Sequence, residues 1–259
     1  MKAKKSLGQH FLTQTSVAER IALSIKPLDG INHVLEVGPG KGMLTQFLFK
    51  SQYHVTMVET DRDMIPNLED TFGTQDTRIL NANFLKADLD ELMPGPFFLA
   101  GNFPYNISSQ ILFKMLANKD RIPQMVGMFQ KEVAERIAAK HGSKTYGILS
   151  VLTQVYYDVE YLFSVKPGAF SPPPKVNSGV IRLIRRPLRH RFSGAFEKKL
   201  RQVVKMSFNQ RRKMIRNSLK SILPENFQDD KEFLTRRPEQ MSKDDFIELT
   251  CILLSLEQN

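Results

Sequence analysis

The residues best suited to chemistry stand together in Asn102-Phe103-Pro104-Tyr105, directly after the apolar run Phe97–Ala100. The run is typical of a strand, so the motif lies at its carboxyl end, where open α/β sheets keep their ligand sites. An exocyclic adenine amine is a poor nucleophile because its lone pair is delocalised into the ring. The Asn102 side-chain oxygen and the Phe103 carbonyl could accept its two hydrogens and free the lone pair. Pro104 would stiffen the turn that aims these oxygens, and Tyr105 would offer a face for base stacking.

A glycine-rich loop, Gly38-Pro39-Gly40-Lys41-Gly42, follows the strand-like run Val34–Val37 and precedes a helix-like segment. Glycines there allow a tight turn and let a ligand touch the backbone. The spacing matches neither the Gly-x-Gly-x-x-Gly of dinucleotide sites nor the P-loop. Glu59, 21 residues beyond Gly38, ends the next strand-like run and could accept both hydroxyls of a ribose. Plain structural turns would also explain each motif alone, but together they favour an adenosine cofactor without a pyrophosphate, such as S-adenosylmethionine.

The scaffold for these residues follows from the alternation of strand-like and helix-like segments, which predicts an α/β fold with a Rossmann-like parallel sheet. Beyond Pro187 no strand pattern survives. We therefore predict a catalytic, cofactor-binding domain over residues 1–186 and a small all-α domain over 187–259. The predicted strands cover 34–37, 54–58, 77–80, 97–100, 125–129, 159–165 and 176–184, and the predicted helices cover 14–26, 43–50, 62–72, 108–117, 131–139, 148–156, 194–222 and 243–256.

Charge is concentrated in one part of a chain whose formal net charge is +10. Residues 180–220 hold 14 Lys and Arg against a single acid, Glu197, whereas the remainder is slightly acidic. Charge runs are often only solvated helix faces, but so concentrated a positive field attracts polyanions through counterion release. The segment has no long apolar face, so nucleic acid is favoured over a membrane. The side chains expected to face phosphates, at helix-compatible spacings, are Arg201, Lys205, Arg211, Arg212, Lys213 and Arg216.

Several classes of protein are excluded by composition. With 41% hydrophobic and 25% charged residues, the chain can bury a core and is neither disordered nor collagen-like. No apolar run approaches the roughly 18 residues of a membrane span, and no apolar stretch follows the basic N-terminus as in a signal peptide. Cys251, the single cysteine, stands in an apolar run and is expected to be buried. A single cysteine fits a reducing cytoplasm, so we expect a cytoplasmic protein, and because the five histidines are scattered we expect no metal site.

A resemblance to a known family rests on four motifs in order. Asn102–Tyr105 looks like the catalytic motif of amino-group DNA and RNA methyltransferases. With Gly8–Leu12 upstream, Phe170–Ser178 downstream and Phe208–Lys213 in the tail, the chain resembles the ribosomal RNA adenine N6,N6-dimethyltransferase family from about Lys5 to Leu219. The resemblance implies an S-adenosylmethionine-dependent methyltransferase sheet with a helical rRNA-binding domain.

The resemblance also implies a role for each matching residue. His10 and Leu12 would close over the cofactor, Gly38 and Gly40 would approach its methionine part, and Glu59 would hold the ribose. Asn102 would bind the target amine beside the cofactor, while Tyr105 and Phe170 would sandwich the adenine. Asn83 departs from the family pattern, which has Asp at this position to accept from the cofactor's adenine amino group. An amide oxygen can accept the same bond without charge assistance, so weaker cofactor affinity is expected rather than lost activity.

The activity implied by this resemblance is dimethylation of two adjacent adenosines in the 3′-terminal hairpin loop of small-subunit rRNA. The partner would be a pre-ribosomal small subunit late in its biogenesis. The enzyme itself would be a monomer. Two alternatives share the fold: a large-subunit rRNA adenine methyltransferase of the macrolide-resistance type, and a non-catalytic RNA-binding assembly factor. The intact Asn102–Tyr105 motif argues against the second. A nicotinamide dehydrogenase is disfavoured by the glycine spacing.

Overall fold

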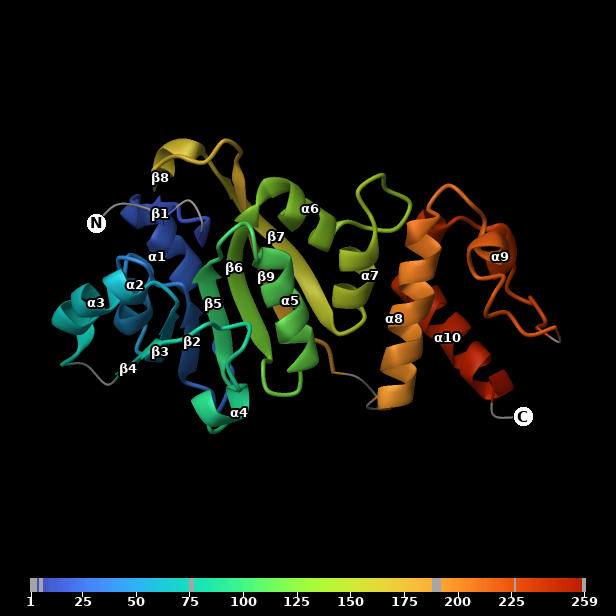
Figure 1. Ribbon diagram of the computed structural model, residues 1–259, viewed down its shortest axis with the longest axis horizontal. Helices are drawn as coiled ribbons and strands as arrows, with labels where there is room; N and C mark the ends of the chain where they lie inside the picture. Colours follow the sequence, from blue (N-terminus) through green and yellow to red (C-terminus); the bar gives the residue numbers. More distant parts are fainter. Residues whose placement is uncertain (1–3, 5–6, 75–76, 188–191, 226, 258–259) are drawn as a thin grey trace. The chain divides into compact units, whose positions relative to one another are not determined.

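The protein was analysed as a computed structural model that describes residues 4, 7–74, 77–187, 192–225 and 227–257. The chain forms two compact units (Figure 1). The first unit comprises residues 1–134 and 158–185, and the second comprises 135–157 and 186–259.

The first unit contains a seven-stranded sheet in its described residues, with strand order β4-β3-β2-β5-β6-β9-β7. The pairs β4–β3, β3–β2, β2–β5 and β5–β6 are parallel, and β9 joins β6 antiparallel. Crossing from β2 to β5 reverses the direction in which the chain adds strands, so the carboxyl ends of these two strands flank a natural ligand crevice. The bounds are β2 His33–Val37, β3 His54–Glu59, β4 Thr77–Asn81, β5 Phe98–Asn102, β6 Gln124–Gln130, β7 Tyr157–Val165 and β9 Ser178–Arg185.

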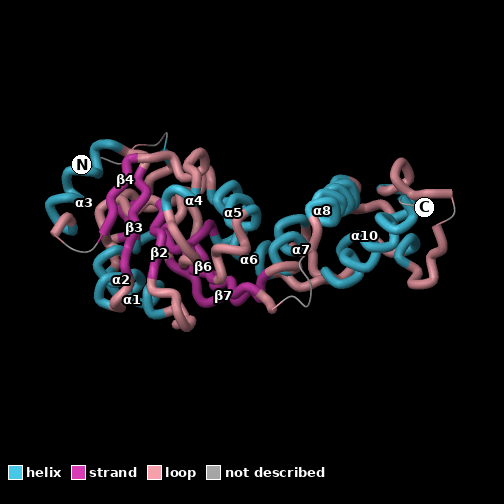
Figure 2. The backbone as a smooth tube through the Cα atoms, turned by 90° about the horizontal axis from the view of Figure 1, so that it is seen from below, coloured by secondary structure: helices cyan, strands magenta, loops and turns pink. Residues whose placement is uncertain are grey.

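Helices cover both faces of this sheet because its central strands are apolar on both sides. Figure 2 shows α1 and α2 on one side and α4 and α5 on the other. A separate two-stranded ladder pairs β1 (Phe11–Leu12) with β8 (Phe170–Ser171), two short strands with no sequence signal. The helices are α1 Thr15–Leu23, α2 Thr45–Lys50, α3 Ile65–Phe72, α4 Leu89–Leu92 and α5 Ser108–Ala117, and α6 Lys131–Ala138 leads into the second unit.

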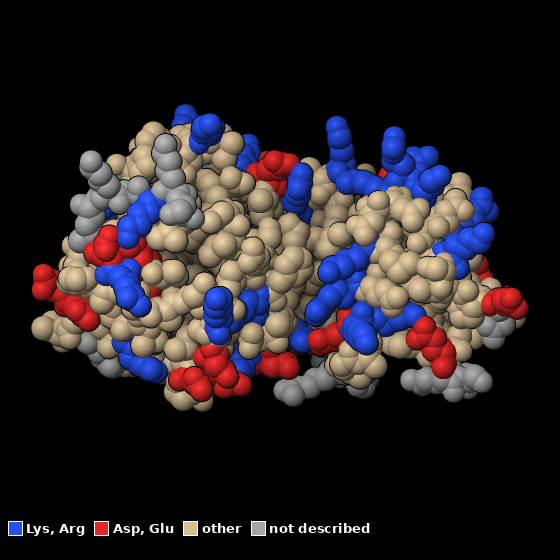
Figure 3. Space-filling view, viewed as in Figure 1, with Lys and Arg blue, Asp and Glu red and all other residues tan. Residues whose placement is uncertain are grey.

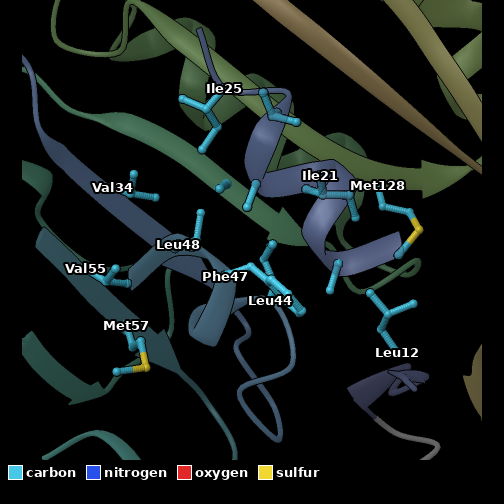
Figure 4. Packing of buried hydrophobic residues seen from close by; sticks show 14 of the residues in the cluster. Leu12, Ile21, Ile25, Val34, Leu44, Phe47, Leu48, Val55, Met57 and Met128 are labelled. Carbon is cyan, nitrogen blue, oxygen red and sulfur yellow. The ribbon is translucent and has the colours of Figure 1, made fainter. Parts of the chain in front are cut away.

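The main core of the first unit lies between α1, α2 and the sheet. Ile21 of α1 and Leu48 of α2 are fully buried and belong to one cluster with Val34 and Met57 of the strands (Figure 4). Leu12 belongs to the same cluster, so the N-terminal segment is anchored in the core. Burial of such side chains contributes about 1.5–3 kcal/mol each, which explains why the apolar runs of the sequence located these elements well.

The second unit is helical in its described residues, as the sequence predicts. It contains α7 Ile148–Gln154, α8 Gly194–Asn209, α9 Ile215–Ser218 and α10 Lys243–Glu257. Ser193 caps α8 by accepting from the Phe196 amide, and α8 packs on α10 through an apolar face. Lys199 is buried on that face with its ammonium paired to Glu257.

The division of the chain differs from the predicted boundary at 186/187 in one segment. Residues 135–157 cluster with the C-terminal helices although they precede β7. The Gln154 amide binds the carbonyls of Ile137 and Ala139, and the Tyr146 ring packs edge-on against Phe208 of α8 at 6.0 Å. Strand and helix patterns along the sequence do not indicate that a segment preceding β7 packs with helices that follow it.

One buried acid in the sheet makes stability depend on pH. Glu36 of β2 is 1% exposed and accepts a hydrogen bond from the Thr45 hydroxyl at 2.7 Å. Burial raises the pKa of Glu36 to about 8, the Thr45 bond opposes that rise, and nearby Glu59 adds to it. The folded protein therefore keeps this proton at a pH where the unfolded chain releases it.

We expect the free energy of unfolding to fall as the pH rises from about 4.5 to about 8, by on the order of a few kcal/mol. Below this window both states carry the proton, so the stability is fully present there. Glu36→Gln should flatten the decline in urea titrations at several pH values, whereas exposed Glu19→Gln should follow the parent. A parent-like slope in Glu36→Gln would show that Glu36 does not cause it.

Candidate active site

The glycine loop after β2 adopts a backbone that other residues resist. Gly38, Gly40 and Gly42 have φ angles of +70°, +58° and +78°. A side chain at Gly40 would press against the Phe11 ring, and one at Gly42 would overlap Phe72. The loop thus needs glycine for conformation and for space, and its glycine amides are used internally, by the carbonyls of Val58 and Pro39 and by Glu59.

Glu59 at the end of β3 ties this loop to the next turn. Its carboxylate accepts from the Gly40 amide at 3.0 Å and from the Asp61 amide at 2.8 Å. Burial raises the pKa of Glu59, while these backbone bonds counteract the rise. A carboxylate has about four acceptor positions, so Glu59 keeps acceptor capacity for a hydroxyl group of a ligand.

The turn after β5 is anchored by Phe103, whose ring occupies a slot formed by Gly101 and Gly127 of the sheet. Gly101 and Gly127 are register partners on β5 and β6, and Phe103 is 1% exposed above them. A Cβ on Gly127 would overlap the Phe103 ring, and one on Gly101 would lie 2.8 Å from it. The Phe103 amide also donates to the Met128 carbonyl at 3.2 Å. Two glycines that sequence reasoning did not single out therefore position the motif.

Asn102 is oriented by the N-terminal segment. Its side-chain nitrogen donates to the His10 carbonyl at 2.9 Å, which leaves the amide oxygen as the acceptor end. The sequence predicted that His10 lies near the cofactor, but not this backbone contact. Together these contacts give Asn102 a defined acceptor direction at the edge of the cavity.

Of the two aromatic residues predicted to sandwich a base, one lies at the cavity. The Tyr105 ring is half-buried, its hydroxyl shares a 2.5 Å hydrogen bond with Ser178, and the His10 ring lies 5.4 Å away. Phe170 is 4% exposed and packs in the core through β8, so it is not among the lining residues. Its predicted role would require it to become accessible when a substrate binds.

One cavity in the first unit collects the other predicted site residues. Asn83 reaches it from the turn after β4, where its side-chain oxygen also accepts from the Leu85 amide at 2.9 Å. Lys41 is the one Lys or Arg among the lining residues, a position that the sequence did not single out. The predicted residues that line this cavity are His10, Leu12, Gly38, Gly40, Glu59, Asn83, Asn102, Pro104 and Tyr105.

Three further findings concern the described residues alone. No group of three or more His, Cys, Asp or Glu side chains is placed to hold a metal ion. No helix within the described ranges is long and apolar enough to cross a membrane. The lone Cys251, expected to be buried, is exposed.

The basic segment 180–220 does not form one surface. Arg182 and Arg185 belong to β9 of the first unit, where Arg182 pairs with Glu160 at 2.5 Å. In the second unit, Arg211 donates to the Ser143 carbonyl at 3.1 Å, so part of its bonding capacity is used internally. Figure 3 shows Lys and Arg side chains on the surface of the second unit. The exposed Lys and Arg residues on α8, on α9 and in the turns beside them are Lys198, Arg201, Lys205, Arg212, Lys213, Arg216 and Lys220.

The sheet order and the glycine loop define a Rossmann-like fold of the methyltransferase type. The solved dimethyladenosine transferase of Plasmodium falciparum aligns with a TM-score of 0.79 at 23% identity, covering 96% of this chain and 98% of that one. The 23S rRNA methyltransferase ErmE aligns with a TM-score of 0.69 at 27% identity, covering 92% and 98%.

The sequence matches the family described as Ribosomal RNA adenine dimethylase over residues 1–251. It is 51% identical over 253 residues to Ribosomal RNA small subunit methyltransferase A of Parabacteroides distasonis, with 97% of this chain and 94% of that protein covered. This chain therefore belongs to the ribosomal RNA adenine dimethylase family.

The Phe103 slot leads to a stability prediction. We expect Gly127→Ala to cost about 1–3 kcal/mol of unfolding free energy, because the new methyl group overpacks the Phe103 ring. Gly95→Ala is the matched control, since its Cβ meets nothing within 4 Å. Adding Phe103→Leu to Gly127→Ala should recover part of the loss in urea unfolding. A double variant less stable than Gly127→Ala alone would contradict the slot.

Proposed function

We propose that this protein transfers methyl groups from S-adenosylmethionine to the N6 amines of two adjacent adenosines in the 3′-terminal hairpin loop of small-subunit rRNA. The main observation behind this proposal is the orientation of Asn102. Its side-chain nitrogen donates to the His10 carbonyl, which leaves its oxygen available, and it lines the same cavity as the glycine loop and Glu59. The Parabacteroides relative, named as a small-subunit enzyme and 51% identical, supports this substrate.

The cavity fits S-adenosylmethionine, which would supply an electrophilic methyl group. Glu59 would accept from the ribose with the acceptor capacity that its backbone hydrogen bonds leave open. Gly38 and Gly40 would let the methionine part approach the backbone, as their positive φ angles permit. Asn83 would accept from the cofactor's adenine amino group, and His10 and Leu12 would cover the cofactor.

Asn102 would activate the target amine by accepting one of its hydrogens while the Phe103 carbonyl accepts the other. The amine would then become pyramidal with its lone pair freed from the ring, and the proton that it loses on methylation would pass to solvent. Tyr105, fixed by its bond to Ser178, would stack on the extruded adenine, and Phe170 would complete the sandwich. Pro104 would keep both acceptors on a rigid turn.

The second unit would bind rRNA, and the exposed cations along α8 and the turn that follows support this role. Arg201, Lys205, Arg212, Lys213 and Arg216 are all exposed, as binding to phosphates requires. Loops and helix ends are the usual targets of RNA-binding proteins because their bases can be splayed out. We infer that the natural substrate is a pre-ribosomal small subunit, that the enzyme acts as a cytoplasmic monomer, and that it needs no metal.

A large-subunit enzyme is the second candidate, since ErmE aligns over 92% of this chain. The two are separated by one assay of methyl transfer to unmethylated small and large ribosomal subunits. Methylation of the small subunit at two adjacent adenosines is expected. Transfer to large subunits alone would replace the proposed function with the second candidate.

Substitutions of Asn102 and Glu59 should have different effects, the first on turnover and the second on cofactor affinity. We expect Asn102→Ala to lower kcat tenfold or more, because its acceptor acts on the reacting amine, while RNA affinity barely changes. Glu59→Ala should instead weaken S-adenosylmethionine binding in calorimetry, because the ribose acceptor is removed. Glu69→Ala, on the exposed face of α3, is the matched control. Near-normal turnover in Asn102→Ala, or unchanged affinity in Glu59→Ala, would each contradict its assignment.

The basic surface should act on RNA alone. We expect the pair Arg212→Glu and Lys213→Glu to weaken small-subunit binding. The log–log slope of affinity against salt should become shallower by roughly one unit for each phosphate that the variant no longer neutralises. Arg211 is kept, because its bond to Ser143 would confound the result. The same charge change at exposed Lys26 and Lys50 is the control. If both pairs behave alike in salt titrations, the second unit is not the RNA surface.

A further inference from the structure

The N-terminal segment, residues 7–12, lines the cofactor cavity and is attached on two sides. On the substrate side, β1 pairs with β8, and the His10 ring nitrogen Nδ1 lies 2.8 Å from the Pro172 carbonyl. Thr13 adds bonds from its amide and hydroxyl to the Ala169 carbonyl. This side holds the segment by backbone pairing and by two side-chain bonds to backbone carbonyls, from His10 and Thr13.

The other side is held by side chains that converge on one carboxylate, Asp61. Lys4 Nζ donates to Asp61 at 2.6 Å, and the Gln9 amide donates to its second oxygen at 2.8 Å. Gln9 in turn accepts from the Lys4 backbone amide at 2.8 Å. We call these three residues, Lys4, Gln9 and Asp61, the latch.

The chemistry of Asp61 shows how strongly the latch is formed. Its side chain is fully buried, whereas that of Lys4 is 41% exposed. Burial alone would raise the pKa of Asp61, but the hydrogen bonds from Lys4 and Gln9 outweigh it, so the pKa lies below its ordinary value. A buried carboxylate that stays ionised needs such partners, because the cost of leaving it unpaired is high.

Asp61 also contacts the predicted ribose acceptor. Its backbone amide donates to Glu59 at 2.8 Å, while its carboxylate holds Lys4 and Gln9. The same residue therefore links the floor of the cofactor cavity to the segment that covers it. Asp63, which also pairs with Lys4 at 2.7 Å, is 66% exposed and makes no such link.

We propose that Asp61 is a positioning residue for cofactor binding, which acts through the latch to hold residues 7–12 over bound S-adenosylmethionine. This inference rests on the proposed function, since it presupposes that cofactor. With the latch closed, cofactor release requires breaking the Lys4 and Gln9 bonds to Asp61. The latch thus sets the residence time of the cofactor rather than the rate of methyl transfer.

The test compares Lys4→Met, Asp61→Asn and the double variant in the full chain. Asn keeps an acceptor for the Asp63 amide, which Asp61 caps at 3.2 Å, so the local turn is preserved. Each single variant should raise the Kd for S-adenosylmethionine about five- to tenfold through faster dissociation, as expected for one half-exposed charged hydrogen bond. The double variant should be no worse than the weaker-binding single variant, because both remove the same interaction.

Controls separate this role from a loss of folding. Asp63→Asn and Lys50→Met remove exposed charges in the same unit and should leave Kd within about twofold, since surface pairs contribute little. In steady-state assays the latch variants should raise KM for S-adenosylmethionine and leave kcat within about twofold. A merely destabilised protein would instead lose kcat at unchanged KM.

The outcomes are distinguishable. Parent-like Kd and dissociation rates in both single variants would overturn the latch while the proposed function stands. A lower kcat with unchanged Kd would also overturn it. If the parent chain does not bind S-adenosylmethionine at all, the proposed function fails and the latch falls with it.

Discussion

The Glu59 carboxylate is the group on which the site depends. It sits at the end of β3, nearly buried, and accepts from Gly40 in one loop and Asp61 in the next. Without those two amides the burial of this acid would favour its neutral form, and the loops would lose their shared anchor. The positions of the glycine loop and of the N-terminal segment therefore both depend on a single ionisable group, Glu59.

The regular elements were largely predictable because each is written locally in the sequence. The apolar runs of β2, β3, β5 and β6 were predicted within about two residues, since strands buried on both faces are mostly apolar. The ladder of β1 and β8 was not predictable, because two-residue strands have no periodicity. The placement of 135–157 in the helical unit was missed for a similar reason: it depends on packing against α8 and α10, far along the chain.

Most residues that line the candidate site were predictable from the sequence, whereas its geometry was less so. Asn102, Glu59 and the glycines could be found because each follows a strand at its carboxyl end. The orientation of Asn102 depends on a backbone carbonyl at His10, which no side-chain pattern encodes. The burial of Phe170 and the inward bond of Arg211 were equally invisible, since aromatic and basic residues look the same in sequence whether they face a core, a partner or solvent. The number of charges along a segment therefore does not show which of the side chains share one exposed surface.

The interleaving of the two units has a consequence for synthesis on the ribosome. The chain leaves the first unit after Ala134, returns at Asp158 and leaves again after Arg185. Once Arg185 has emerged, every strand of the large sheet is available, whereas residues 135–157 must wait for α8 and α10 to be translated. During that interval α7 carries an apolar face without its partners. The nascent chain should thus complete its catalytic sheet first. Residues 135–157 can pack only later, when α8 and α10 have been synthesised.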